Sequence, residues 1–218
     1  AVRHARLDQP GRFVRHDREI LGEASRPTAN GAAWVAEALA AARAAGGSSL
    51  IGTGDAVGAL RTTYPQVRLL LVGDGPVAQD LRARVHAGGL GDIVVFAGAV
   101  PRAQVPAFID AMDIGVLAAS NPFGSPIALF ELMGMGKAVV ALDIGPVRDV
   151  MEDDVTGCLV TPGDGVALTA LLARLVSEPE LRRSLGEKAR ARVLERHTWA
   201  ANGRYVADLA ARFSAGAP

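Results

Sequence analysis

Hydrophobic positions along the chain form short continuous runs, and from Val67 these runs alternate with stretches of helical periodicity. Each run is apolar throughout, which is typical of strands buried on both faces of a parallel sheet. We therefore expect strands at residues 67–72, 93–96, 114–117, 138–141 and 158–160. The pattern predicts an α/β fold: a Rossmann-like parallel sheet with helices on both faces.

Three helices are expected near the carboxyl end of the chain, where apolar residues recur every three or four positions. The last begins near Trp199 and carries Val206, Leu209 and Phe213 on one face. Large aromatic side chains contribute strongly to cores, so Trp199 is predicted to be a core anchor rather than a sugar platform. This helix is accordingly expected to cross back over the fold.

Residues 1–60 follow a less regular pattern and are expected to be a divergent or partly ordered segment. Within them the Ala-rich stretch Asn30–Gly47 predicts a helix, capped by Asn30 and stopped by two glycines. A short strand is expected at residues 48–51. The Gly-rich residues 52–58 are expected to form a loop rather than a phosphate-binding turn. The main domain is therefore predicted over residues 61–218, and whether the first segment contributes to its sheet stays open.

Composition narrows the function classes. Half of the 218 residues are hydrophobic, and 23 Lys and Arg balance 23 Asp and Glu, so no electrostatic footprint for nucleic acid is present. The single Cys158 and four histidines exclude a disulfide framework and a Cys/His zinc site. No signal-peptide pattern or membrane-spanning run occurs. We expect a cytoplasmic protein, with peripheral membrane contact left open.

A loop followed by a helix start gives the first candidate site. Ser125 occupies an N-cap position and Pro126 the first helical position, so the next backbone N–H groups, beginning at Ile127, have no partner within the helix. Gly124 keeps side chains away from this end. Such a helix end carries partial positive charge and open donors, and it suits a phosphate.

Glu131 follows one turn later, on a face otherwise made of apolar residues. We expect its carboxylate to accept hydrogen bonds from ribose hydroxyls; the alternative is a structural carboxylate that caps backbone or pairs with an arginine. Ligands of open parallel sheets bind beyond the carboxyl ends of the strands. The loops expected there are rich in small residues, and the turn that begins at Gly73 is predicted to line a nucleotide cleft rather than bind NAD.

Several motifs occur together and in order: LLLVGDGP at 69–76, VVFAGAVP at 94–101, and the long run from Ser125 to Asp164. In these motifs the chain resembles the donor-binding half of the group 1 (family 4) retaining glycosyltransferases, which have the GT-B fold. The similarity covers roughly residues 64–213. It implies a single GT-B half-domain that binds a nucleotide-diphosphate sugar as donor substrate, with no metal and no cofactor.

The resemblance also assigns residues. It matches Glu131 to the second Glu of the family's Glu–seven residues–Glu motif, which holds the ribose. It implies that backbone around Gly124, Ser125, Pro126 and Ile127 meets the diphosphate, and that backbone near Gly98 and Val100 meets the base.

The chain departs from the family at several positions. Phe123 stands where the family has the first Glu of the motif. The family's Arg and Lys at the start of this domain have no counterpart in residues 1–60, and Arg102 and Arg148 are the nearest substitutes. Lysine occurs only at positions 137 and 188. The family's acceptor-binding domain is not matched, so an N-terminal acceptor domain or a partner chain is expected.

Three functions remain open at this point, and no catalytic residue is predicted. The first is transfer of a sugar from a nucleotide sugar to an acceptor hydroxyl with retained configuration; the acceptor is unknown. The second is a non-catalytic nucleotide-sugar-binding module or inactive fragment that needs a partner acceptor domain. The third is an epimerase acting on a nucleotide sugar. Fold alone does not choose among them.

Overall fold

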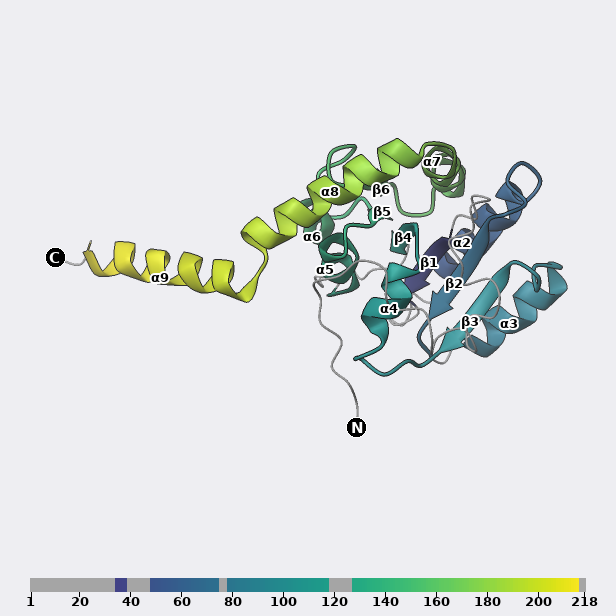
Figure 1. Ribbon diagram of the computed structural model, residues 1–218, viewed down its shortest axis with the longest axis horizontal. Helices are drawn as coiled ribbons and strands as arrows, with labels where there is room; N and C mark the ends of the chain where they lie inside the picture. Colours follow the sequence, from purple (N-terminus) through teal and green to yellow (C-terminus); the bar gives the residue numbers. More distant parts are fainter. Residues whose placement is uncertain (1–33, 39–47, 75–77, 118–126, 216–218) are drawn as a thin grey trace.

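A parallel six-stranded sheet organises the chain, as the ribbon in Figure 1 shows. The computed structural model describes residues 34–38, 48–74, 78–117 and 127–215. Within these ranges the strand order is β3-β2-β1-β4-β5-β6. Every neighbouring pair of strands is parallel. The strands are β1 (Trp34–Ala38), β2 (Arg68–Val72), β3 (Val94–Gly98), β4 (Ile114–Leu117), β5 (Ala138–Leu142) and β6 (Cys158–Val160).

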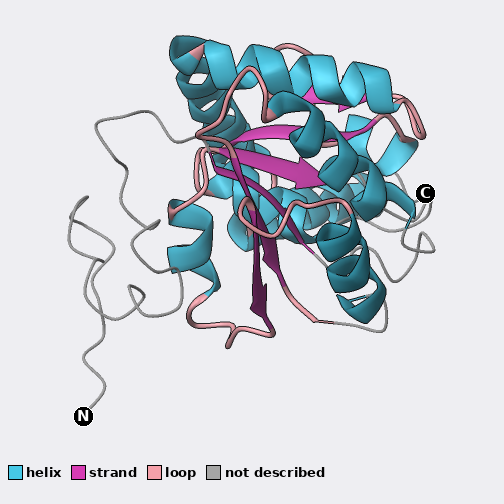
Figure 2. Ribbon diagram, turned by 90° about the vertical axis from the view of Figure 1, so that its right-hand side faces the viewer, coloured by secondary structure: helices cyan, strands magenta, loops and turns pink. Residues whose placement is uncertain are grey.

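Helices cover both faces of this sheet, and Figure 2 shows the strands enclosed between them. Buried residues of α2, α3 and α7 pack on one face, and those of α4, α5 and α6 pack on the other. Helix α8 contributes buried residues to both packing clusters. The helices are α2 (Ser48–Leu60), α3 (Ala78–Ala87), α4 (Val105–Asp110), α5 (Ile127–Gly134), α6 (Gly145–Arg148), α7 (Gly165–Ser177), α8 (Pro179–Arg196) and α9 (Trp199–Ala215).

Successive side chains of each strand point to opposite faces of the sheet, and this alternation divides the core into two halves. Leu69 and Leu71 of β2 point to the face covered by α2 and α7, and Leu70 points to the opposite face. Strand β5 is buried at every position. Successive strand side chains point to opposite faces, so a strand covered on both sides has to be apolar throughout. The continuous apolar runs of the sequence thus correctly predicted the parallel sheet and its two helical layers.

Where the structure describes residues 30–60, the expectations were wrong. Residues 34–38 of the predicted helix Asn30–Gly47 form strand β1, which pairs with β2 on one side and with β4 on the other; the rest of that helix lies outside the described residues. Helix propensity is worth less than about 1 kcal/mol per residue, so pairing on two sides overrides it. The predicted strand at 48–51 and the loop at 52–58 are instead helix α2, whose Ala56, Val57 and Leu60 are buried. The first segment therefore contributes to the sheet.

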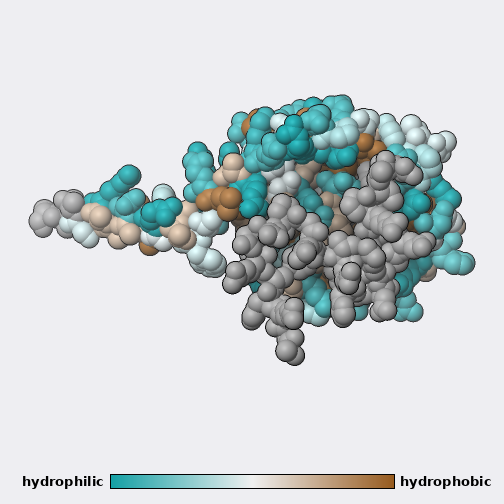
Figure 3. Space-filling model, in the orientation of Figure 1, coloured by the Kyte–Doolittle hydropathy of each residue, from teal (hydrophilic) through white to brown (hydrophobic). Residues whose placement is uncertain are grey.

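Helix α9 extends away from the body of the molecule (Figure 1). Trp199 is 93% exposed, so the prediction that it is a core anchor was wrong. Val206, Leu209 and Phe213 are exposed as well, and Figure 3 shows apolar residues along one side of this helix. An amphipathic pattern predicts a face suited to burial, but it does not say what covers that face. Over the described part of the chain, no helix has both the length and the hydrophobicity needed to span a bilayer.

Candidate functional site

The order of the strands reverses direction between β1 and β4, and this point marks the place where open α/β sheets bind ligands. The residues that follow these two strands, 39–47 and 118–126, lie outside the described part of the chain. The predicted phosphate contacts at Gly124, Ser125 and Pro126 therefore also lie outside it. The site can be built from what surrounds these residues.

Helix α5 begins at this edge of the sheet. Its first residue, Ile127, is 68% exposed, although Leu129 and Met133 are fully buried in the core. The amides of the first turn of a helix have no partner within the helix and carry partial positive charge. The start of α5 is thus open to solvent while its body is fixed by packing, which suits the predicted contact with a diphosphate.

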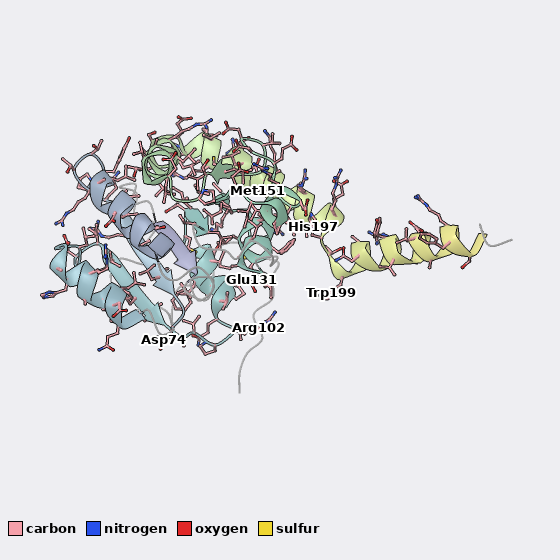
Figure 4. The ribbon with its side chains drawn as sticks, turned by 180° about the vertical axis from the view of Figure 1, so that it is seen from behind. Asp74, Arg102, Glu131, Met151, His197 and Trp199 are labelled. Carbon is pink, nitrogen blue, oxygen red and sulfur yellow. The ribbon has the colours of Figure 1, made fainter. Side chains whose placement is uncertain are left out.

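Glu131 belongs to α5. Figure 4 labels it in the same view as Asp74 and Arg102. The residue is half-buried. Among the residues that the structure describes, none makes a hydrogen bond or ion pair with its carboxylate. The arginine partner that the alternative interpretation requires is therefore not found in this part of the chain. A half-buried acceptor with open lone pairs is well suited to hydroxyl groups.

Gly73, Gly98 and Val100 are brought together at the carboxyl ends of β2 and β3. The amide of Gly73 donates to the carbonyl of Gly98 at 2.8 Å. Both glycines have positive φ, 121° and 70°, a region that other residues rarely adopt. A β-carbon built at Gly98 would meet nothing within 4 Å, so open space lies beside this backbone. Val100, two residues further along the chain, is half-buried.

Among the described residues, Arg102 and Arg148 are the cationic candidates at this edge. Arg148 of α6 binds Asp143, which follows β5, through two hydrogen bonds, one of them 2.7 Å between Nη2 and Oδ2. The hydrogen bond and the charge of Arg148 lower the pKa of Asp143. Arg102 is exposed in the chain segment between β3 and α4. Of the two substitutes that the sequence offered for the family's cations, Arg148 is thus already paired, a contact that no sequence pattern predicted.

Both lysines lie away from the site. Lys137 precedes β5 at the opposite, amino-terminal edge of the sheet and donates to the carbonyl of Asp110 at 2.9 Å. Burial lowers its pKa, while the charges of Asp110 and Asp113 act in the other direction. Lys188 is exposed on α8. Across the described ranges, no group of His, Cys, Asp and Glu side chains is arranged to hold a metal ion.

Close backbone packing holds α5 in place. A β-carbon at Gly115 of β4 would lie 2.7 Å from Cδ1 of Leu132, so the helix lies directly against the strand. A β-carbon at Gly186 of α8 would lie 2.0 Å from the carbonyl oxygen of Gly136, just after α5. Arg190 of α8 also donates to the carbonyl of Gly134. The carboxylate of Glu131 therefore sits on a helix fixed from two sides.

Comparisons with known proteins identify the family of this chain. The profile of the family "Glycosyl transferases group 1" matches residues 54–192. Alpha-D-kanosaminyltransferase of Streptomyces kanamyceticus is 30% identical over 142 residues, 65% of this chain and 36% of that protein. 2-deoxystreptamine N-acetyl-D-glucosaminyltransferase of Streptomyces fradiae is 32% identical over 148 residues, 68% of this chain and 33% of that protein. The chain thus spans about a third of the length of these curated relatives.

Solved structures share the fold. Sucrose-phosphate synthase from Thermosynechococcus elongatus superposes with a TM-score of 0.70 at 25% identity, over 85% of this chain and 46% of that one. Anabaena Alr3699/HepE in complex with UDP gives a TM-score of 0.70 at 24% identity, over 83% of this chain and 49% of that one. The sheet order, the motifs and the profile all lead to the same assignment. This chain belongs to the group 1 glycosyltransferases, with the architecture of one half of a GT-B fold.

Proposed function

We propose that this chain is the donor-binding half of a retaining glycosyltransferase and binds a nucleotide-diphosphate sugar at the carboxyl edge of its sheet. The backbone of residues 124–126 and of Ile127, the first residue of α5, contacts the diphosphate. Glu131 accepts hydrogen bonds from the ribose, and backbone near Gly98 and Val100 contacts the base. The proposal extends to this chain what the family resemblance implies.

The observation that carries the proposal is the environment of Glu131. Its carboxylate is half-buried on a packed helix, and no described residue engages it. Hydrogen bonds to a charged group contribute about 1.5–3 kcal/mol, and a half-buried acid without such partners costs stability unless solvent or a ligand supplies them. A ribose offers two hydroxyl donors side by side, which matches two carboxylate oxygens.

The chemistry that these groups support is departure of the diphosphate. Negative charge grows on the leaving phosphate as the bond to the sugar breaks. The partial positive charge at the start of α5 stabilises that charge in place, because its amides are already oriented. The acceptor and the residues that activate it are expected from a separate domain or a partner chain. The names of the relatives support sugar transfer: two are transferases of amino sugars.

Isothermal titration calorimetry tests the ribose contact. Uridine, guanosine and adenosine diphosphates are titrated into the wild-type chain, into Glu131→Gln and into the control Glu187→Gln, an exposed carboxylate of α8 paired with Arg183. Loss of a charged hydrogen bond predicts a Kd about 10- to 150-fold weaker for Glu131→Gln. The control is expected to match the wild type. Equal affinities for all three proteins, or no binding of any nucleotide, would refute the proposal.

The 2′-deoxy form of the nucleotide that binds makes the test specific. If Glu131 holds the ribose, removing the 2′-hydroxyl weakens binding to the wild type but changes little in Glu131→Gln. The two changes then remove the same contact, and their effects are not additive. Additive losses would mean that Glu131 acts on another part of the ligand.

A second candidate function is a nucleotide-sugar-binding module without catalysis. Arg148 is already paired with Asp143, and neither lysine lies at the site, so the described residues offer little charge for the leaving diphosphate. Release of free sugar from a nucleotide sugar, or its transfer to an acceptor, distinguishes the two. Binding without any turnover, also after addition of an acceptor domain, favours the module.

A further inference from the structure

Residues 197 and 198 form the corner at which the chain turns from α8 into the last helix, α9. Helix α8 ends at Arg196, and the amide of His197 donates back to the carbonyl of Val193 at 2.9 Å. Thr198 begins α9, because its hydroxyl accepts a hydrogen bond from the amide of Ala201 at 3.1 Å. Beyond this corner α9 projects away from the body (Figure 1). All described side chains of α9 except the half-buried Ala201 are exposed, so within the described part of the chain its orientation depends on the contacts at the corner.

His197 supplies a contact from this corner to the body. Its ring packs against Phe130 of α5, with the ring centroids 5.3 Å apart and the planes inclined by 58°. Figure 4 places it between α5 and the start of α9. The Nε2 atom is buried and has no hydrogen-bond partner among the described residues. A neutral imidazole can leave this nitrogen as an unprotonated acceptor, but an imidazolium carries an N–H there that needs a partner.

The charges around His197 oppose its protonation. Burial of the ring has the largest effect and lowers the pKa of His197. The positive charges of Arg192 and Arg196 on α8 lower this pKa further. The carboxylates close to these arginines are turned to them: Glu152 lies 3.4 Å from Arg192, and Glu195 lies 3.6 Å from Arg196. On α5 the ring meets the uncharged Phe130. No acid of the described residues thus compensates a charge on this imidazole.

We propose that His197 is a proton-controlled lock at the corner between α8 and α9. As a neutral ring it packs on Phe130 and fixes the direction of α9. When a proton binds Nε2, the charged ring leaves this apolar contact for water, and α9 loses its fixed direction. The packing of α5 against the sheet does not depend on the ring, so the body of the domain stays folded.

The direction of the pH effect follows from the two states of the imidazole. A histidine in the open state titrates near pH 6.5, and the locked state resists protonation. The contact therefore contributes its full stability above about pH 6.5 and loses it as the pH falls toward the lower pKa of the locked ring. The lock is thus expected to be closed at neutral pH and to open under mild acid.

Distance measurements by electron paramagnetic resonance test the lock. Spin labels are attached at Lys188→Cys on α8 and Ala211→Cys on α9, which are both exposed. They lie at most ~40 Å apart, because the two helices, rising 1.5 Å per residue, contribute about 30 Å and the corner between them up to about 10 Å. Cys158 needs no replacement, since it is fully buried and burial raises its pKa to about 11. The distance distribution is expected to be narrow at about pH 7.5 and broad at about pH 5.

Three variants separate the lock from general acid effects. His197→Phe keeps a ring on Phe130 without a titratable nitrogen, so its distribution is expected to stay narrow at both pH values. His197→Lys carries a charge throughout and is expected to be broad at both. His86→Phe, at an exposed histidine of α3, is expected to behave as the wild type. A wild-type distribution that does not change with pH would overturn the proposal. Equal acid broadening in His197→Phe, or a narrow distribution for His197→Lys, would overturn it too.

Discussion

Replacing Gly186 by alanine is expected to destabilise the domain although it adds only one methyl group. Gly186 lies in the middle of α8, where the helix crosses the turn between α5 and β5. A β-carbon there would lie 2.0 Å from the carbonyl oxygen of Gly136 and 2.8 Å from its carbonyl carbon. Both are backbone atoms, so no side chain can rotate away to make room.

The size of the effect follows from two opposing terms. Ordinary carbon contacts need more than 3 Å, so α8 has to retreat by over 1 Å along a face that also buries Ala189 and Val193. Overpacking of this kind costs about 1–3 kcal/mol, and a clash with backbone belongs at the top of that range. The higher helix propensity of alanine offsets about 1 kcal/mol of this loss in the free energy of unfolding. The net loss is expected to be about 2 kcal/mol.

Thermal unfolding followed by circular dichroism measures this loss. For a chain of this size about 2 kcal/mol corresponds to a fall in Tm of about 4–8 °C. Gly54→Ala in α2 is the matched control, because a β-carbon there would meet nothing within 4 Å, and it is expected to leave Tm unchanged or raise it. If Gly186→Ala melts at or above the wild-type temperature, the close approach of α8 to this turn is not real.

Three further predictions concern single side chains. Phe213→Asp on α9 should change the free energy of unfolding by less than about 0.5 kcal/mol, because Phe213 is 75% exposed; a clear fall in Tm would show that α9 is packed in solution. Cys158 should not react with a thiol reagent at about pH 8 until the chain unfolds, since burial raises its pKa to about 11; fast labelling of native protein would contradict this. Arg148→Ala should raise the pKa of Asp143 toward its ordinary value, as an NMR titration can measure; an unchanged pKa would show that the pair does not form.

The place of α5 in the fold could be predicted from the sequence because it depends on local signals, while the ligand contacts assigned to the carboxyl edge of the sheet stay predictions. A buried strand followed by a small-residue loop and a helix start predicts where a parallel sheet presents its ligands, and α5 and Ile127 lie at that edge. Gly73 and Gly98 were also placed correctly at neighbouring strand ends. The pair between Asp143 and Arg148 was not predicted, because residues five apart across a short helix follow no recurring pattern.

Strands β2 to β6 could be predicted from the sequence, because a strand covered on both faces has to be apolar at every position, as β5 is. Residues 34–38 could not be predicted as a strand, because their pairing with β2 and β4 overrides a helical composition. Only the tertiary structure showed Trp199 exposed on a helix that leaves the body. The local sequence pattern indicates that a residue favours burial. Whether it is buried depends on which other surfaces of the folded molecule pack against it.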